Sequence, residues 1–214
     1  MMSAKPCLPS AASNPSNQAS RGTSPWEHDL AGLYAGKNVV AEMKRTDRDK
    51  DWPFITSLGN EMLRARDQRG WLHLFEPDAL LECQDEDSIP SELFSSRPLL
   101  QLAINRDPRL RMAVMAERHF WQELDRLRIR IYRAALRPYV LAMGRARISS
   151  GLALPEQHRE RVACAEKSLA QTPIASYGVD RLIAEARAAT AAFVQPELLE
   201  WLPNVRPYFT FLEL

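Results

Sequence analysis

The chain has 214 residues, of which 45% are hydrophobic and 26% are charged, and these are ordinary proportions for a folded globular protein. Its formal net charge of +1 argues against a protein whose whole surface binds nucleic acid. The sequence has neither the run of about 20 apolar residues that a membrane span requires nor a C-x-x-C pair among its three cysteines, so we expect a cytoplasmic protein without membrane contacts.

Residues 1–25 are rich in Ser, Ala, Asn and Pro and contain few large apolar side chains. Such a segment buries too little apolar surface to offset the entropy lost on ordering. We therefore predict a disordered arm over 1–25 and a helical domain over 26–214. The domain is divided into a first part, 26–147, and a second part, 152–214.

A helix is predicted to begin at Trp52. Asp51 can cap its first turn, and Pro53 is tolerated there because the N–H that proline lacks has no partner in a first turn. Helical spacing predicts an inner face of apolar residues and an outer face of polar ones, namely Phe54, Ile55, Leu58 and Met62 inside and Thr56, Asn60 and Glu61 outside. Gly59 is expected to weaken the helix slightly.

The segment 44–51, in front of this helix, alternates in charge. In one interpretation its side chains pair with one another at the helix N-terminus, where carboxylates are favoured. In the other it is a nucleotide site, where basic residues hold phosphates and carboxylates position Mg²⁺ or orient a lysine; the candidates are Lys44, Arg48, Asp49, Lys50 and Asp51. We predict no other cofactor and no catalytic set. A calcium loop is not predicted, because its glycine and its bidentate glutamate are missing.

Charge is unevenly distributed along the chain. Between Gly70 and Ser96 there are seven acidic residues and no Lys or Arg, whereas between Asn105 and Arg147 there are eleven arginines and four acidic residues. Either the two segments neutralise each other, or the basic one faces an acidic partner. The sequence leaves both possibilities open.

The longest predicted helix runs over 107–137. Asp107 is a cap and Pro108 fits the first helical position. The next proline is Pro138, which we expect to kink or end the helix. The predicted buried seam repeats at three and four residues and consists of Phe120, Leu124, Leu127, Ile131 and either Ala134 or Ala135.

The other faces of this helix carry arginines that lie close together. Because arginine matches the geometry of phosphate, this face is a candidate nucleic-acid-binding surface formed by Arg126, Arg130, Arg133 and Arg137. The aromatic residues needed to stack on bases lie largely on the buried seam. A solvated or ion-paired helix face is the alternative, and the sequence favours it.

Two histidines are considered as ligands. His73 lies in an apolar cluster, and His119 precedes Glu123 by four residues. His73 has one carboxylate at helical spacing, Glu76, and the pair His119 and Glu123 lacks a third ligand, so neither histidine has the ligand set of a metal site. We predict that His73 is packed or lies on the surface, and that His119 and Glu123 form a surface hydrogen bond.

The second part of the domain is predicted to contain a helical hairpin. Its two helices, over 155–170 and 180–194, are expected to dock on the long helix. The terminal residues 208–214 are apolar for a chain end, and we predict that they pack into the core.

The segment Glu42–Ile55, EMKRTDRDKDWPFI, resembles the K-x-T-x-R-D-K-D-W-P segment that follows the catalytic domain of uncharacterised bacterial nucleotidyltransferase-like proteins. The similarity continues through Arg97-Pro98-Leu99-Leu100 and Phe120-Trp121 and covers roughly residues 39–137. That family carries a Gly-Ser pair and a metal-holding Asp-x-Asp pair upstream, and this sequence contains no Gly-Ser. The resemblance therefore implies the C-terminal helical half of the family without its catalytic domain.

These observations predict an all-α protein, an irregular bundle built around the helix over 107–137. The first functional hypothesis is a non-catalytic helical module that binds a protein partner or nucleic acid. The second is an enzyme that binds or transfers nucleotides through the segment 44–51. The third is a functionless remnant of a larger protein. The sequence leaves the oligomeric state open.

Overall fold

The computed structural model of the protein describes residues 35–86, 88–146, 151–170 and 172–212. Over these ranges the fold is all-α, as predicted, and contains no strand; the predicted disordered arm lies outside them. The α-helices are α1 (Lys37–Met43), α2 (Trp52–Arg64), α3 (Pro77–Glu86), α4 (Leu100–Ile104), α5 (Leu110–Ala146), α6 (Leu154–Ser168), α7 (Pro173–Tyr177) and α8 (Val179–Ala191). Short 3-10 helices lie between them: η3 (Asp49–Asp51), η4 (Gln68–His73), η5 (Ser91–Ser95), η6 (Pro196–Trp201) and η7 (Arg206–Leu212). None of the described helices is long and apolar enough to cross a membrane.

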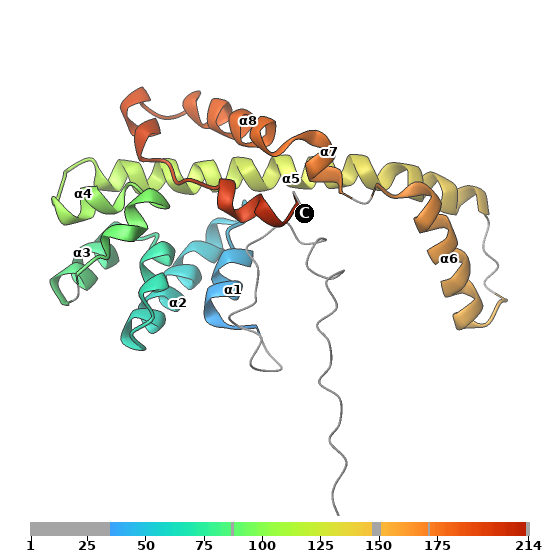
Figure 1. Ribbon diagram of the computed structural model, residues 1–214, viewed down its shortest axis with the longest axis horizontal. Helices are drawn as coiled ribbons and strands as arrows, with labels where there is room; N and C mark the ends of the chain where they lie inside the picture. The colour runs from blue at the N-terminus through green and yellow to red at the C-terminus, as the bar shows by residue number, and fades with distance from the viewer. Residues whose placement is uncertain (1–34, 87, 147–150, 171, 213–214) are drawn as a thin grey trace, which may run out of the picture.

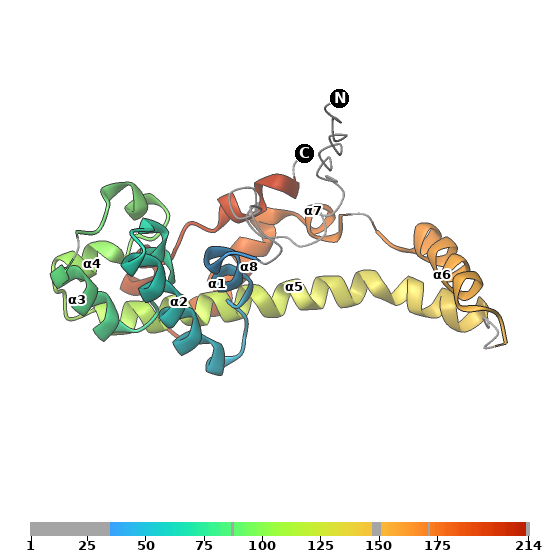
Figure 2. The ribbon, with the colours of Figure 1, turned by 90° about the horizontal axis from the view of Figure 1, so that it is seen from below.

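The long helix α5 organises the molecule. Figure 1 shows α8 above its N-terminal half and α1, α2 and α3 below it. Its C-terminal half extends beyond these helices to α6, as Figures 1 and 2 both show. The N-terminal half of α5 is therefore enclosed by other helices, and the C-terminal half projects from the bundle.

The observed ends of α5 differ from the prediction of 107–137. Asp107 does help the start, because its Oδ1 accepts a hydrogen bond from the backbone N–H of Arg109 at 2.8 Å. At the other end the helix continues through Pro138 to Ala146, so Pro138 does not end the helix, and the alternative expectation of a kink at Pro138 stays a prediction. One proline removes a single backbone hydrogen bond, and the turns on both sides of it remain helical.

The predicted seam of α5 is confirmed for Phe120, Leu124, Leu127 and Ile131, which are buried. Ala135 is half-buried, and Ala134 is exposed. The seam packs into a single core that also contains large aromatic residues from the loops and helices below α5, among them Trp52, Trp71 and Phe75. This core holds the first part of the chain on the N-terminal half of α5.

The inner face of α2 was predicted only in part. Ile55 and Met62 are buried, but Phe54 is exposed and Thr56 is buried. The inner face instead starts from Trp52 and repeats at three and four residues through Ile55, Thr56 and Gly59. Thr56 is accommodated because its hydroxyl accepts a hydrogen bond from the backbone N–H of Phe75 at 3.0 Å.

Gly59 has a packing role that the sequence did not show. It faces Gly70 of η4, and the two backbones touch: a Cβ on Gly70 would lie 2.6 Å from the carbonyl oxygen of Gly59. Only two glycines allow this close approach. The crossing places η4 against α2 and so fixes the position of His73.

The second part of the chain packs on α5 without forming the predicted hairpin. Figure 1 shows α8 over the N-terminal half of α5 and α6 near its C-terminal end. The predicted packing of the chain end is confirmed for Phe209, which is buried, and for Tyr208, which packs against the core. Tyr208 also makes the polar contact described below.

Candidate functional site

The charged segment 44–51 is a network of internal contacts centred on Asp51, which is buried. Asp51 Oδ2 accepts a hydrogen bond from Arg48 Nε at 2.9 Å, and its Oδ1 lies 3.6 Å from Lys44 Nζ. Burial raises the pKa of the Asp51 carboxyl, but the hydrogen bond and charge of Arg48 and the charge of Lys44 hold the pKa below its ordinary value. Asp51 therefore fixes the turn that leads into α2, although it makes no side-chain capping bond.

Two other carboxylates of the segment bind α5. Asp49 Oδ1 accepts a hydrogen bond from the Gln122 amide at 2.7 Å. Asp47 Oδ2 lies 3.6 Å from Arg126 Nε, and the backbone N–H of Asp47 donates to Asp125 Oδ2 at 3.2 Å. The structure thus brings the segment 44–51 against the first of the four predicted arginines. Lys50 is exposed.

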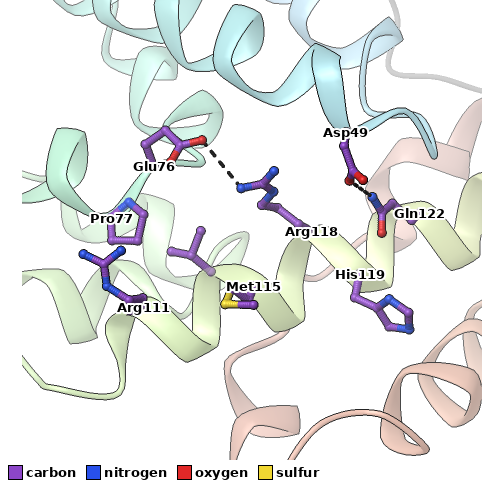
Figure 3. A pocket seen from close by; sticks show the side chains of 9 residues that line it. Asp49, Glu76, Pro77, Arg111, Met115, Arg118, His119 and Gln122 are labelled. Atoms are coloured by element: carbon purple, nitrogen blue, oxygen red, sulfur yellow. Dashed lines mark hydrogen bonds and ion pairs between the residues drawn. The ribbon is translucent and has the colours of Figure 1, made fainter.

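A pocket of about 510 Å³ lies where this segment meets α5 and the start of α3. Figure 3 shows Arg118 reaching between Glu76 and Asp49, while His119 points away from them. The charged groups that line the pocket have partners in the chain: Arg118 lies 3.5 Å from Glu76, Arg111 lies 3.1 Å from Asp78, and Asp49 is bonded to Gln122. The pocket is therefore balanced in charge.

A buried ion pair joins Arg97, which precedes α4, to Glu117 of α5. Arg97 Nη2 lies 2.7 Å from Glu117 Oε2, and Arg97 Nε donates to both carboxylate oxygens. The guanidinium also donates to the carbonyl oxygens of Trp71 and Leu74 at 2.7 and 2.8 Å. Because every one of these groups is shielded from water, the pair holds η4 and α5 in one relative position.

A second buried arginine, Arg45, has no carboxylate partner within the described residues. It donates to Tyr208 Oη at 2.9 Å, to the carbonyl oxygen of Leu72 at 3.0 Å and to His73 Nδ1 at 2.9 Å. Aromatic rings surround the guanidinium, with centroids 4.8 Å away for Trp121, 5.4 Å for Tyr208 and 5.6 Å for Phe75. The aromatic faces therefore take the place of a counter-ion.

His73 was predicted to be either packed or at the surface. It is packed, because its side chain is fully buried. Its Nε2 lies 2.8 Å from Asn38 Oδ1. Burial lowers its pKa well below 6.5, and the charges of Arg45, Arg97 and Arg69 lower it further. The prediction of a hydrogen bond between His119 and Glu123 is wrong, because His119 Nε2 lies 3.9 Å from Glu123 Oε1. The His119 ring packs on Phe193 instead.

A partial signal for this buried polar cluster is present in the sequence. Glu117 lies three or four residues from Ala113 and Phe120, so helical spacing places it on the core face of α5. A carboxylate on a core face requires a buried partner. The identity of that partner, Arg97, depends on tertiary contacts that no sequence spacing encodes.

Among the described side chains, the acidic segment 70–96 pairs with the N-terminal half of α5. Asp78 and Glu76 lie next to Arg111 and Arg118, within the N-terminal half of the helix. Farther along, Arg126 contacts Glu123 and Asp47, and Arg130 lies 3.2 Å from Glu185 of α8. The last two of the four predicted arginines, Arg133 and Arg137, are exposed and form no ion pair within the described residues.

Apolar side chains are exposed beside these two arginines. Leu136 is 45% exposed, Val140 is 62% exposed and Ile129 is 37% exposed. We name this part of α5 the arm surface, which is distinct from the predicted disordered arm over 1–25. The arm surface consists of Ile129, Arg133, Leu136, Arg137 and Val140. Of the candidate residues predicted from the sequence, the arm surface contains Arg133 and Arg137 and leaves out the segment 44–51.

No group of three or more His, Cys, Asp or Glu side chains is placed to hold a metal ion in the part of the chain that the structure describes. Comparisons of the chain with family models, with curated proteins and with solved structures find no match.

Proposed function

We propose that the protein is a non-catalytic helical module that binds an acidic protein partner through the arm surface. The observation that carries this proposal is the alternation of exposed aliphatic side chains with arginines on a helix that projects from the bundle. Leu136 and Val140 lie about one helical turn apart. Arg137 lies between them in the sequence, and Arg133 precedes Leu136 by three residues. Arginine around an apolar centre is typical of protein interfaces.

The positive charge of the C-terminal half of α5 favours an acidic partner. Between Arg126 and Pro155 the chain contains seven arginines and no Asp or Glu. The ion pairs between the acidic segment 70–96 and α5 that involve described residues lie nearer to the start of the helix, at Arg111 and Arg118. A partner with a negative surface would be steered to the arm and would supply the missing counter-ions.

The aliphatic residues favour a protein over a nucleic acid. Phosphates bind arginine, but a sugar–phosphate backbone offers little apolar surface to Leu136 and Val140. Single-stranded bases require exposed aromatic rings to stack on, whereas Tyr132 and Tyr139, the tyrosines of the C-terminal half of α5, are half-buried. Binding that depends on both the arginines and the aliphatic residues is a property of protein interfaces.

The contacts of the segment 44–51 support a structural role for it. Lys44 and Arg48 lie on Asp51, and Asp49 lies on Gln122. To bind phosphate, the two basic residues would have to leave a carboxylate that helps to fix the start of α2. This arrangement favours the first of the two interpretations of the segment, in which the charges pair with one another.

The test compares the wild-type protein with two arm variants in co-purification from cells of the source organism, after nuclease treatment. Arg133→Glu/Arg137→Glu reverses the charge, and Leu136→Gln/Val140→Gln removes the apolar side chains. We expect one protein to be recovered with the wild type and to be lost with each variant, but to be kept by the control Arg159→Glu/Arg161→Glu on α6. Recovery that is insensitive to both arm variants, or that disappears with nuclease, would contradict the proposal.

A further inference from the structure

One stripe along the C-terminal half of α5 carries a heptad pattern. Apolar or aromatic residues recur there at alternating intervals of three and four, at Ile129, Tyr132, Leu136, Tyr139 and Met143. Ile129 and Leu136 are exposed, and the other three are half-buried. A seam with this spacing is the surface that a helix presents to a second helix in a coiled coil.

The seam is unpaired on its outer side, although α6 and α7 also contact α5. Tyr132 packs partly against the core, and Tyr139 and Met143 are also half-buried. By contrast Leu136, in the middle of the seam, keeps 45% of its surface exposed. The described helices therefore cover the seam in part and leave Ile129 and Leu136 exposed.

Arginines flank the seam where coiled coils carry their interhelical ion pairs. Arg133 immediately follows the seam residue Tyr132 and so occupies a flanking position, and Arg126 lies seven residues earlier, before the first seam residue Ile129. Arg126 already contacts Glu123 and Asp47, but Arg133 has no ion pair within the described residues. A facing helix would meet Arg133 with a carboxylate.

From the heptad spacing and the flanking charge we infer that the partner contributes an acidic amphipathic α-helix, which packs along α5 from Ile129 to Met143. This inference rests on the proposed function and names the structural class of the partner. The contact spans 15 residues, whose first and last lie about 21 Å apart along the helix at 1.5 Å per residue. A second copy of this chain does not fit, because its own arm carries the same positive charge.

Three acidic peptides test the inference on the full-length protein. The first has Leu and Ile at the core positions of three heptads and Glu at the flanking positions. The second has the same residues in shuffled order, so that its charge is kept and its seam is lost, and the third is polyglutamate. Binding of each labelled peptide is measured by fluorescence anisotropy, and helix formation by circular dichroism.

We expect the heptad peptide to bind at least about 10-fold more tightly than the shuffled one, which is a difference of about 1.4 kcal/mol, and to gain helicity on binding. Leu136→Glu should reduce binding of the heptad peptide to the level of the shuffled peptide, while the control Val162→Glu on α6 should not. Thermal melting verifies that both variants are folded.

Equal binding of the heptad and shuffled peptides would overturn the inference and leave the proposed function standing, because the surface would then recognise charge alone. If the heptad peptide does not bind although a partner is recovered in the co-purification described above, the inference that the partner contributes a helix would also be overturned. The proposed function itself would be contradicted if the partner recovered in co-purification were lost with the control variant Arg159→Glu/Arg161→Glu but kept by the two arm variants.

Discussion

Arg45 and His73 are joined by a buried hydrogen bond of 2.9 Å between the Arg45 guanidinium and His73 Nδ1. Arginine has no acceptor atom, so Nδ1 must carry a lone pair and Nε2 must carry the proton. That proton is donated to Asn38 Oδ1 at 2.8 Å. The contact therefore requires a neutral imidazole in a fully buried position.

The protein should lose stability in acid because of this contact. The pKa of His73 in the folded state lies well below 6.5, and burial is the main cause, followed by the charges of Arg45, Arg97 and Arg69. The unfolded state therefore binds a proton that the folded state does not, and the free energy of unfolding falls as the pH decreases from 6.5 towards the depressed pKa. The slope contributed by one histidine is at most about 1.4 kcal/mol per pH unit.

Urea unfolding at a series of pH values measures this slope. His73→Gln removes the titrating group, so its stability should change less than that of the wild type between pH 6.5 and the acid end of the series. Parallel curves for the two proteins would show that His73 does not carry the effect.

Removal of the buried pair between Arg97 and Glu117 should be far more damaging than removal of a surface pair. Glu117→Gln leaves a buried guanidinium without its counter-ion, and we expect a loss of about 3–5 kcal/mol in the free energy of unfolding. Asp78→Asn removes the partner of Arg111 at an exposed site, and we expect a loss of less than about 1 kcal/mol. Urea titration of both variants checks the difference, and similar losses would contradict the burial of the pair.

Substitution of Gly70 should have the opposite effect to substitution of Gly144. A methyl group on Gly70 would lie 2.6 Å from the Gly59 carbonyl oxygen, so Gly70→Ala should destabilise the protein by about 1–3 kcal/mol. Gly144 lies in α5 with nothing within 4 Å of an added Cβ. Gly144→Ala should therefore stabilise the protein by up to about 1 kcal/mol through helix propensity. Thermal melting of both variants decides whether η4 and α2 really cross this closely.

Magnesium–nucleotide mixtures should leave the melting temperature unchanged. A ligand that binds only the folded state raises this temperature, but the basic residues of the segment 44–51 that would hold phosphate, Lys44 and Arg48, contact Asp51. A rise of several degrees that is abolished by Asp49→Asn would contradict this account and support the nucleotide-binding alternative.

The sequence predicts most of the helices because the signals for them are local. The cap and proline at Asp107 and Pro108 and the regular spacing of Phe120, Leu124 and Leu127 identify α5 without tertiary information. Of the two expectations for Pro138, the end of the helix is wrong, because the loss of one backbone hydrogen bond does not stop a helix that continues on both sides.

The polar contacts are harder to predict than the helices. Arg45 bonds Tyr208 across 163 residues of sequence, and Arg97 bonds Glu117 across 20. No spacing rule relates such pairs, because only the packing of η4, α5 and η7 brings them together. The burial of Thr56 likewise depends on a single hydrogen bond from Phe75.

The arm surface was predicted in part. The arginines of α5 were visible in the sequence, but the acidic and basic segments could equally have neutralised each other. The structure shows that pairing reaches Arg111, Arg118, Arg126 and Arg130 but not Arg133 or Arg137 within the described residues. Within the described residues, these ion pairs therefore leave Arg133 and Arg137, in the C-terminal half of α5, exposed and without an ion pair.

The most direct test of protein binding by the arm is site-specific photo-cross-linking in cells of the source organism. A photoreactive residue replaces Leu136 in one protein and Arg159, on α6, in the control. We expect a discrete protein adduct from position 136, absent from position 159 and lost when Arg133→Glu/Arg137→Glu is added. A nucleic-acid adduct, or the absence of any adduct from position 136 in a protein that is folded, would contradict the proposal that the arm binds a protein.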